Sequence, residues 1–226
     1  MASVACALRC GTGSAGGYTR GMAITNGYCT LDQVKAALRI TDSVDNALLE
    51  GAVESASRLI DGYAMRNFYQ SGTVTRYFAT DNPLVLQSDD LAGTAITVES
   101  SPAADGSWTT WAATDYQLEP LNGNLDGIPW AYDRIRAVED YVFPTGNAFG
   151  DGEEALVRVT GVFGWPSVPK AIETATIIQS SRIFKRYDSP LGVAGFGDFG
   201  AVRVSRFLDP DVEQLVMPYR KMRNIR

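Results

Sequence analysis

Few residues in this sequence have the types and spacings that catalysis needs. The chain has 226 residues and no histidine, so the commonest general base and the usual hydrolase triads are missing. Ser180 and Ser189 have no imidazole to activate them, and Lys35 and Lys170 fall at predicted helix positions without an apolar pocket. The sequence therefore predicts a protein that is not an enzyme.

Carboxylates offer another route to chemistry, because two of them flanking a glycosidic bond would make a glycosidase. No pair is set apart, and the candidates have the setting of turn and surface acids (Asp89–Asp90, Asp133, Glu139–Asp140 and Glu153–Glu154). The D-x-D-x-D-G pattern of a calcium loop is also absent. A carboxylate-based hydrolase is therefore kept only as a third hypothesis for function.

The cysteines could in principle hold a metal. Cys6, Cys10 and Cys29 all lie near the N-terminus. A C-x3-C spacing without histidine makes a poor zinc site, and an odd number does not suggest a disulfide framework. We expect incidental reduced thiols, no metal ion and no cofactor.

A glycine-rich stretch, "RYDSPLGVAGFGDFGAVRV" (186–204), holds four glycines within nine positions (Gly192, Gly195, Gly197 and Gly200). It matches neither G-x-x-x-x-G-K-[ST] nor a strand–G-x-G-x-x-G–helix arrangement, so it does not predict a phosphate site. Its apolar residues distinguish it from a polar Gly/Ser linker (Val193, Phe196 and Phe199). We expect the loop to pack, either within the chain or on a neighbouring subunit.

The four tryptophans permit a binding function. Trp108, Trp111, Trp130 and Trp165 could form a platform on which sugars stack, which makes a carbohydrate- or receptor-binding β-module the main alternative. Because each tryptophan buries a large area, we expect these side chains to fill the core of the β-region instead.

Helical periodicity occurs at both ends of the chain. Thr30 and Gln33 form a capping-box pattern ahead of one helix. The next helix has an apolar row that predicts its buried face (Val44, Leu48, Ala52, Ser55, Leu59 and Tyr63, widened by Ala47, Ala56 and Ile60). A third helix follows "GWPSVP", and Asp209–Pro210 begins a last one that Pro218 kinks or ends.

The middle of the chain is rich in short strand patterns. "TVTRYF", "PLVLQ", "AITVES", "DYQLEP" and "EALVRVTGVFG" contain β-branched and aromatic residues and are separated by turn signals such as Asn122–Gly123 and Asp126–Gly127. The predicted fold is therefore of the α+β class. A helical core (28–70 and 166–226), made of an N-terminal helical hairpin and C-terminal helices, carries an inserted small antiparallel β-sandwich or barrel module (71–165). The Gly-rich, aperiodic residues 1–27 predict a mobile tail, with Met22 as a possible natural start.

Charge is unevenly distributed. The net charge is −6, which argues against a dedicated nucleic-acid binder. Residues 80–160 contain fourteen acids and three bases, whereas residues 182–226 contain nine bases and five acids. This asymmetry suits either a subunit that meets differently charged partners at its two faces or an ordinary solvated surface. No apolar run is long enough to cross a bilayer, so we expect no membrane association.

Three segments together resemble the head-to-tail adaptor (connector) proteins of long-tailed phages, especially those of actinobacterial phages. They are "YCTLDQVKAALRITDSVDNALLEGAVESASRLIDGYAMRNF", "VRVTGVFGWPSVPKAIETATIIQSSRIFKRYDSPLG" and "AVRVSRFLDPDVEQLVMPYRK". The combination of GWPxVPxAI, a helix and "RYDSPLG" is the most specific part. The resemblance covers about half of the chain, and the long N-terminal tail departs from the family pattern.

The resemblance implies a structural virion protein without catalysis. Such adaptors form a twelve-subunit ring beneath the portal, extend the channel through which DNA passes without sequence-specific binding, and dock a head-tail stopper or tail terminator protein. They reside in the virion neck after assembly in the host cytoplasm. A stopper or tail-completion protein is a related alternative.

The resemblance also assigns interface residues. The family's C-terminal portal-docking segment corresponds to residues 209–226, with three apolar and three charged anchors (Leu215, Val216 and Tyr219; Arg220, Lys221 and Arg223). In a ring, the glycine-rich loop would lie at a subunit boundary. We therefore predict that Val193, Phe196 and Phe199 contact a neighbouring subunit.

Overall fold

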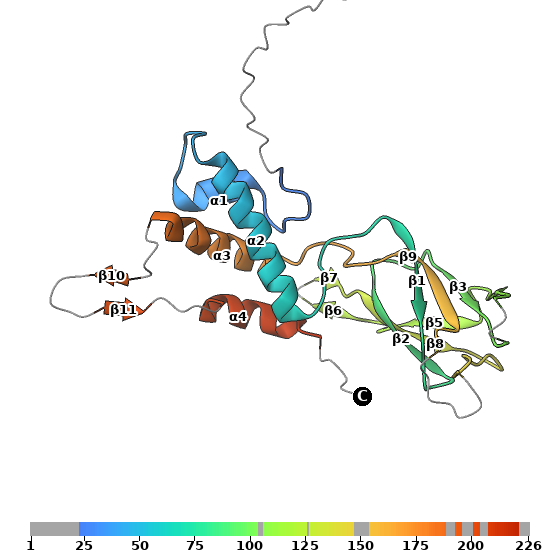
Figure 1. The fold of residues 1–226 in the computed structure, drawn as a ribbon. Helices are drawn as coiled ribbons and strands as arrows, with labels where there is room; N and C mark the ends of the chain where they lie inside the picture. The colour runs from blue at the N-terminus through green and yellow to red at the C-terminus, as the bar shows by residue number, and fades with distance from the viewer. Residues whose placement is uncertain are drawn as a thin grey trace, which may run out of the picture.

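The computed structural model describes residues 23–103, 106–125, 127–146, 154–188, 193–195, 201–203 and 208–221. Its helices and antiparallel sheets confirm the predicted α+β class. Helices occur on both sides of the strand-rich middle of the sequence, and in space they lie together beside the strands (Figure 1).

The helices form one packed group, here called the helical body. It comprises α1 (Leu31–Leu38), α2 (Asn46–Ala64), α3 (Lys170–Asp188), α4 (Pro210–Val216) and the short 3-10 helix η2 (Met217–Tyr219). The contacts of α3 with α1, α2 and α4 join the N-terminal and C-terminal helices. The helical body is therefore built from segments more than 100 residues apart.

Local signals in the sequence set the ends of these helices. Thr30 and Gln33 form the predicted capping box at α1, each side chain accepting a backbone N–H of the other residue. Asp209 caps α4 by accepting from the N–H of Asp211, next to Pro210 in the first turn. Pro218 lies in η2, so α4 ends before it, as predicted.

The buried face of α2 differs from the predicted row. Val44 is 85% exposed, and Leu48 and Leu59 are also exposed. Three residues of the predicted stripe are buried as expected, Ala52, Ala56 and Ile60, and the rest of the buried face was not predicted (Leu49, Val53, Ser57 and Ala64). The prediction was wrong at Leu48 and Leu59, because α2 is apolar on two faces and the position of α3 decides which face is buried.

Nine strands of the middle region, β1–β9, make up what we call the β-module. Its sheets are antiparallel, and among the described residues their strand orders are β1-β9-β3-β4, β2-β8-β5 and β6-β7. The strands are β1 (Thr73–Phe78), β2 (Val85–Leu91), β3 (Thr97–Ser100), β4 (Thr109–Thr110), β5 (Tyr116–Glu119), β6 (Asn124–Leu125), β7 (Ile128–Pro129), β8 (Tyr132–Ala137) and β9 (Val157–Val162).

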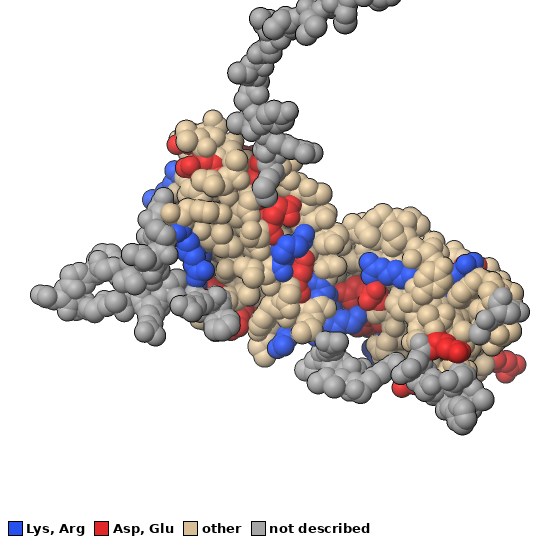
Figure 2. All heavy atoms as spheres, in the orientation of Figure 1, with Lys and Arg blue, Asp and Glu red and all other residues tan. Residues whose placement is uncertain are grey.

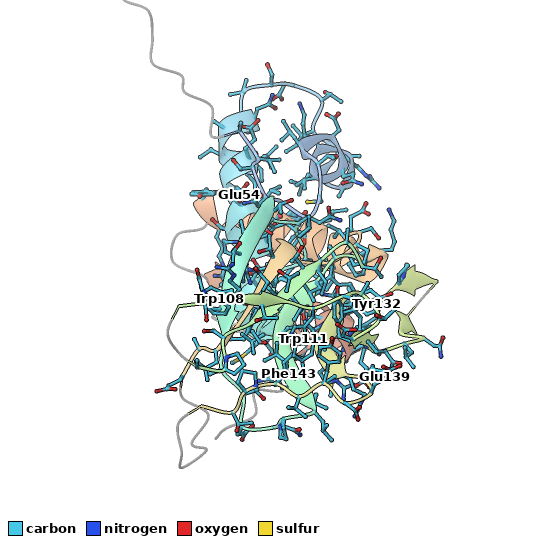
Figure 3. All side chains as sticks on the ribbon, turned by 90° about the vertical axis from the view of Figure 1, so that its right-hand side faces the viewer. Glu54, Trp108, Trp111, Tyr132, Glu139 and Phe143 are labelled. Atoms are coloured by element: carbon cyan, nitrogen blue, oxygen red, sulfur yellow. The ribbon has the colours of Figure 1, made fainter. Side chains whose placement is uncertain are left out.

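The two larger sheets enclose a single apolar core. Val157 and Val159 of β9 alternate inward with half-buried residues and meet Leu86 of β2 and Ile135 of β8. Trp111 stacks on Phe143 with ring centroids 4.7 Å apart inside this core (Figure 3). The arrangement is that of the expected small β-sandwich.

Strand β8 was not predicted, and β2 runs further than its predicted end at Gln87. Three of the six residues of β8 are charged (Asp133, Arg134 and Arg136), which masks the alternation of its inward Ile135 and Ala137. Ion pairs across the sheet accommodate these charges, including Arg136 Nε to Glu119 Oε1 at 2.6 Å. The existence of β8 and the end of β2 therefore depend on pairing between distant strands, which the local sequence pattern does not show.

A small hairpin follows α3 within the glycine-rich stretch. β10 (Val193–Gly195) pairs with β11 (Ala201–Arg203), with Val193 opposite Arg203. The strand expected at Val202 is therefore present, and β10 is an additional one. In Figure 1 this hairpin stands clear of the helical body.

Candidate functional site

Two parts of the protein bear on function: the C-terminal segment, for which the sequence predicts docking, and the junction between the helical body and the β-module. Among the described residues there is no cluster of three or more Cys, Asp or Glu placed to hold a metal. No described helix has the length and apolarity needed to span a membrane.

The C-terminal segment is anchored inside its own subunit. Val216 and Tyr219 are 0% and 1% exposed and belong to the core of the helical body. Tyr219 packs against Phe68, Trp130 and Trp165. These two residues are therefore buried within their own subunit, and their predicted role at the portal stays a prediction.

Other predicted anchors differ in accessibility. Leu215 is half-buried against the same core. Arg220 is exposed, with its guanidinium 5.3 Å from the centroid of the Tyr63 ring. Met217, which the sequence analysis did not single out, is 68% exposed. Arg223, Phe196 and Phe199 lie outside the described residues, and for Val193 only the strand position is described.

Lys221 ties the end of the helical body to the β-module. Its backbone N–H donates to the carbonyl oxygen of Ala64 at 2.8 Å. Its Nζ donates to the carbonyl oxygen of Ser88 at 3.0 Å and lies 3.4 Å from Asp90 Oδ1. The predicted charged anchor thus has partners on both parts of its own subunit.

Asp90 is the centre of this junction. Its side chain is 6% exposed, and Oδ2 accepts from Trp165 Nε1 at 3.1 Å. Arg66, two residues after the end of α2, places Nε 3.5 Å from the same oxygen, and its own side chain is 4% exposed. One buried carboxylate therefore forms ion pairs with two cations from the helical body. The sequence analysis took Asp89–Asp90 for surface acids, which is wrong for Asp90.

Tryptophans reinforce the junction. The Arg66 guanidinium carbon lies 5.5 Å from the Trp130 ring centroid and 5.4 Å from that of Trp165. Trp165 is 1% exposed in the core of the helical body, and Trp130 packs against that core. Of the four tryptophans expected in the β-core, Trp111 is buried there, whereas Trp165 and Trp130 pack in or against the core of the helical body.

Basic and acidic side chains gather where the helical body meets the β-module (Figure 2). Arg76 of β1 pairs with Asp89 at 2.6 Å, both partly exposed. With Asp61, Arg66, Asp90 and Lys221, these residues line one pocket. The burial of Asp90 could be predicted only by knowing that β2 continues through this residue. The sequence near Asp90 does not show this, because β2 is extended by its pairing with the distant strand β8.

Beside this pocket, Tyr28 fastens the start of the folded chain to α2. Its hydroxyl donates to Asp61, and it accepts the N–H of Phe68 at 2.9 Å. Burial raises the pKa of Tyr28, and the adjacent Asp61 carboxylate raises it further. Burial also raises the pKa of Asp61. Arg58 pairs with Asp61 at 2.8 Å, so this carboxylate has partners that do not belong to the pocket.

One aromatic patch of the β-module is exposed. Tyr77 is 59% exposed, with its ring centroid 5.9 Å from that of Trp108. Arg158 lies over the Trp108 ring at 4.6 Å and donates to Glu99. Trp108 lies away from the Trp111–Phe143 stack in Figure 3.

Comparison with known proteins yields one family and several structures. Residues 28–89 match the sequence profile described as "Phage gp6-like head-tail connector protein". No curated protein sequence matches this chain. A chain from the neck of an empty gene transfer agent (GTA) particle, computed with C6 symmetry, shares the fold with a TM-score of 0.51 and 18% identity over 90% of this chain and 94% of that one.

A second neck structure, of a native GTA particle computed with C12 symmetry, gives a TM-score of 0.48 at 17% identity over 88% of this chain and 96% of that one. The family match covers α1, α2, β1 and part of β2. The resemblance to phage head-tail connector proteins that the sequence indicated is therefore confirmed, by the connector profile over residues 28–89 and by the fold of a virion neck protein.

Proposed function

We propose that this chain is a head-to-tail adaptor of the type found in actinobacterial phages: a structural virion protein that forms a ring beneath the portal. The match of residues 28–89 to the connector family carries this proposal. In this role the ring extends the DNA channel, offers a docking face to a stopper or tail terminator protein, and passes DNA at genome ejection. Its location is the virion neck, after assembly in the host cytoplasm.

The ring has twelve copies in this proposal, as in the family that the chain resembles. Sixfold symmetry was used for the neck of the structural neighbour, and twelve copies are compatible with it. Closed rings require two different faces on each subunit. The exposed apolar side chains on the outer face of α2, Leu48 and Leu59, support a packing face for an adjacent subunit.

The portal contact is assigned to residues 209–226. Val216 and Tyr219 position the segment on the helical body from within the core, and Leu215 supports them. Exposed Arg220 and Met217 then face the portal, together with Arg223 beyond the described residues. Lys221 holds the segment against the β-module.

The β10–β11 hairpin is assigned to the subunit boundary. In a ring, Val193, Phe196 and Phe199 would pack on the adjacent subunit. Gly195→Pro is expected to impair ring assembly more than subunit folding, measured by native mass spectrometry and by thermal melting. Equal loss of both would contradict this assignment.

The acidic β-module is assigned to the DNA channel, because a wall of acids repels phosphates and lets DNA slide. Several of these acids already have basic partners, such as Glu99 with Arg158. A virion map with the β-module on the outside of the neck would remove this part of the proposal.

Portal binding tests the function biochemically. Purified portal rings mixed with the full chain should give a complex whose native mass adds one adaptor per portal subunit. Arg220→Glu should weaken that complex at least tenfold, whereas Arg39→Glu, at the C-cap of α1, should not. The absence of a portal complex at saturating chain concentration would contradict the adaptor role.

A second candidate is carbohydrate or receptor binding by the β-module. The exposed Tyr77 beside Trp108 favours it, because paired aromatic faces stack on sugars. Glycan-array binding by the full chain, lost in Tyr77→Ala, would support this function. A stopper or tail-completion role would instead place the chain at the tail and away from the portal.

A further inference from the structure

The junction between the helical body and the β-module contains a pocket of about 490 Å³. Ligand pockets in proteins typically have volumes of a few hundred Å³ or more. The cavity is lined by three basic and three acidic side chains (Arg66, Arg76 and Lys221; Asp61, Asp89 and Asp90). The lining of the pocket is therefore highly charged, with equal numbers of basic and acidic side chains.

The ion pairs change that balance. Asp61 accepts from the hydroxyl of Tyr28 and pairs at 2.8 Å with Arg58, which does not line the pocket and also lies 3.7 Å from Glu54. Asp89 is paired with Arg76. That leaves Asp90 as the single carboxylate for both Arg66 and Lys221. Around Asp90, the inner part of the pocket therefore holds two cations and one carboxylate.

Arg66 also has hydrogen-bond donors without acceptors. Its Nε and Nη1 atoms are buried and have no hydrogen-bond partner among the described residues. Buried donors of a charged group are costly to leave unmatched. The guanidinium carbon lies 5.5 Å from the centroid of the Trp130 ring and 5.4 Å from that of the Trp165 ring, which restricts its position. The donors are therefore held ready for an acceptor at a defined place.

We infer that this pocket binds one carboxylate, supplied by an aspartate or glutamate side chain of a partner protein. A carboxylate brings the single negative charge that the inner pocket lacks, and its oxygens can accept from Arg66 Nη1 and from Lys221 Nζ. Arg76 lies at the rim beside Asp89 and orients an entering acidic segment. The pocket is thus a recognition site for an acidic side chain.

A DNA phosphate would bring the same single charge, but the surroundings disfavour it. Asp61 and Asp89 line the same pocket, and the chain has a net charge of −6. A nucleic-acid strand carries many phosphates that these acids would repel, whereas a single acidic side chain brings one charge. The charge of the surroundings therefore favours a protein partner.

The test uses the full chain labelled with 15N-arginine and two matched probes at constant chloride concentration. N-acetyl-glutamic acid amide should shift the Arg66 Nε–H resonance saturably, and neutral N-acetyl-glutamine amide should not. Equal shifts with both probes, or none with either, would overturn the inference. Tighter binding of the dinucleotide dTpdT than of the glutamate probe would also overturn it, in favour of nucleic acid.

Lys221→Gln is the informative variant, because it removes the excess charge while Arg66 keeps Asp90. We expect this variant to bind the glutamate probe at least tenfold more weakly than the wild type does. Lys170→Gln changes the net charge equally on an exposed site of α3 and should leave binding unchanged. Wild-type affinity in Lys221→Gln would refute the site. These measurements need no portal or ring, so they succeed or fail separately from the proposed function.

Discussion

Asp90→Asn is expected to destabilise the protein strongly, because it removes the buried carboxylate that pairs with both Arg66 and Lys221. The amide is nearly the same size, so the change leaves packing in place. The asparagine keeps one carbonyl oxygen as an acceptor but replaces the other carboxylate oxygen with an N–H₂ group. That group would meet either the Trp165 Nε1–H donor or the Lys221 ammonium, and it can accept from neither. Arg66, at 4% exposure, would then be an uncompensated buried cation.

The magnitude follows from the burial of the group. Breaking a buried ion pair by removing one partner costs about 3 to 5 kcal/mol. For a chain of this size, each kcal/mol shifts Tm by about 2 to 4 °C, so the expected loss is about 6 to 20 °C. Asp89 provides a matched control on the neighbouring position, because its side chain is 55% exposed and its pair with Arg76 is at the surface. Exposed pairs contribute about 0.2 to 1 kcal/mol, so Asp89→Asn should lower Tm by no more than about 4 °C.

Differential scanning calorimetry of the two variants and the wild type at pH 7 measures this difference. The reasoning predicts a large loss for Asp90→Asn and a small one for Asp89→Asn. Equal Tm values for the two variants would refute the assignment of Asp90 as the buried centre of the junction.

Three further predictions concern the backbone, a thiol and a surface ion pair. Gly164→Ala should lower Tm by more than about 6 °C in thermal melts, because Gly164 has φ of +119° and an added Cβ would collide with the carbonyl oxygen of Tyr69; unchanged melting would contradict this. Burial raises the pKa of the Cys29 thiol to about 12, so at pH 8 its alkylation should be on the order of a thousandfold slower in the native chain than in urea, as followed by peptide mass spectrometry; similar rates would contradict it. The hydrogen bond from Arg158 holds the pKa of Glu99 below its ordinary value. The ion pair therefore stabilises the chain fully at pH values above the ordinary pKa, and this stabilisation is lost as pH falls through the lower pKa of the folded state. The Tm advantage of the wild type over Glu99→Gln should therefore shrink between about pH 5 and pH 3; a constant difference would contradict it.

Local features were the most predictable part of the fold. The capping box at Thr30 and the Asp209–Pro210 helix start depend on residues within four positions of each other, so the sequence contains them completely. β1 likewise has the bounds of its sequence pattern. In these places propensity and tertiary structure agree.

Features that depend on distant partners could not be predicted. The buried face of α2 was wrong at Leu48 and Leu59 because contact with α3, more than 100 residues away, decides it. Asp90 looked like a surface acid because its partners Arg66 and Lys221 are separated from it by 24 and 131 residues. Sequence reasoning therefore missed the charged junction that holds the predicted docking segment.

Imaging of assembled necks with this chain labelled tests the central claim most directly. Electron cryomicroscopy of virions carrying a small tag at the N-terminus of the chain would locate each copy. The adaptor role predicts twelve copies in a ring that contacts the portal, with residues 209–226 at the contact. Six copies at the tail, or a label away from the neck, would contradict it.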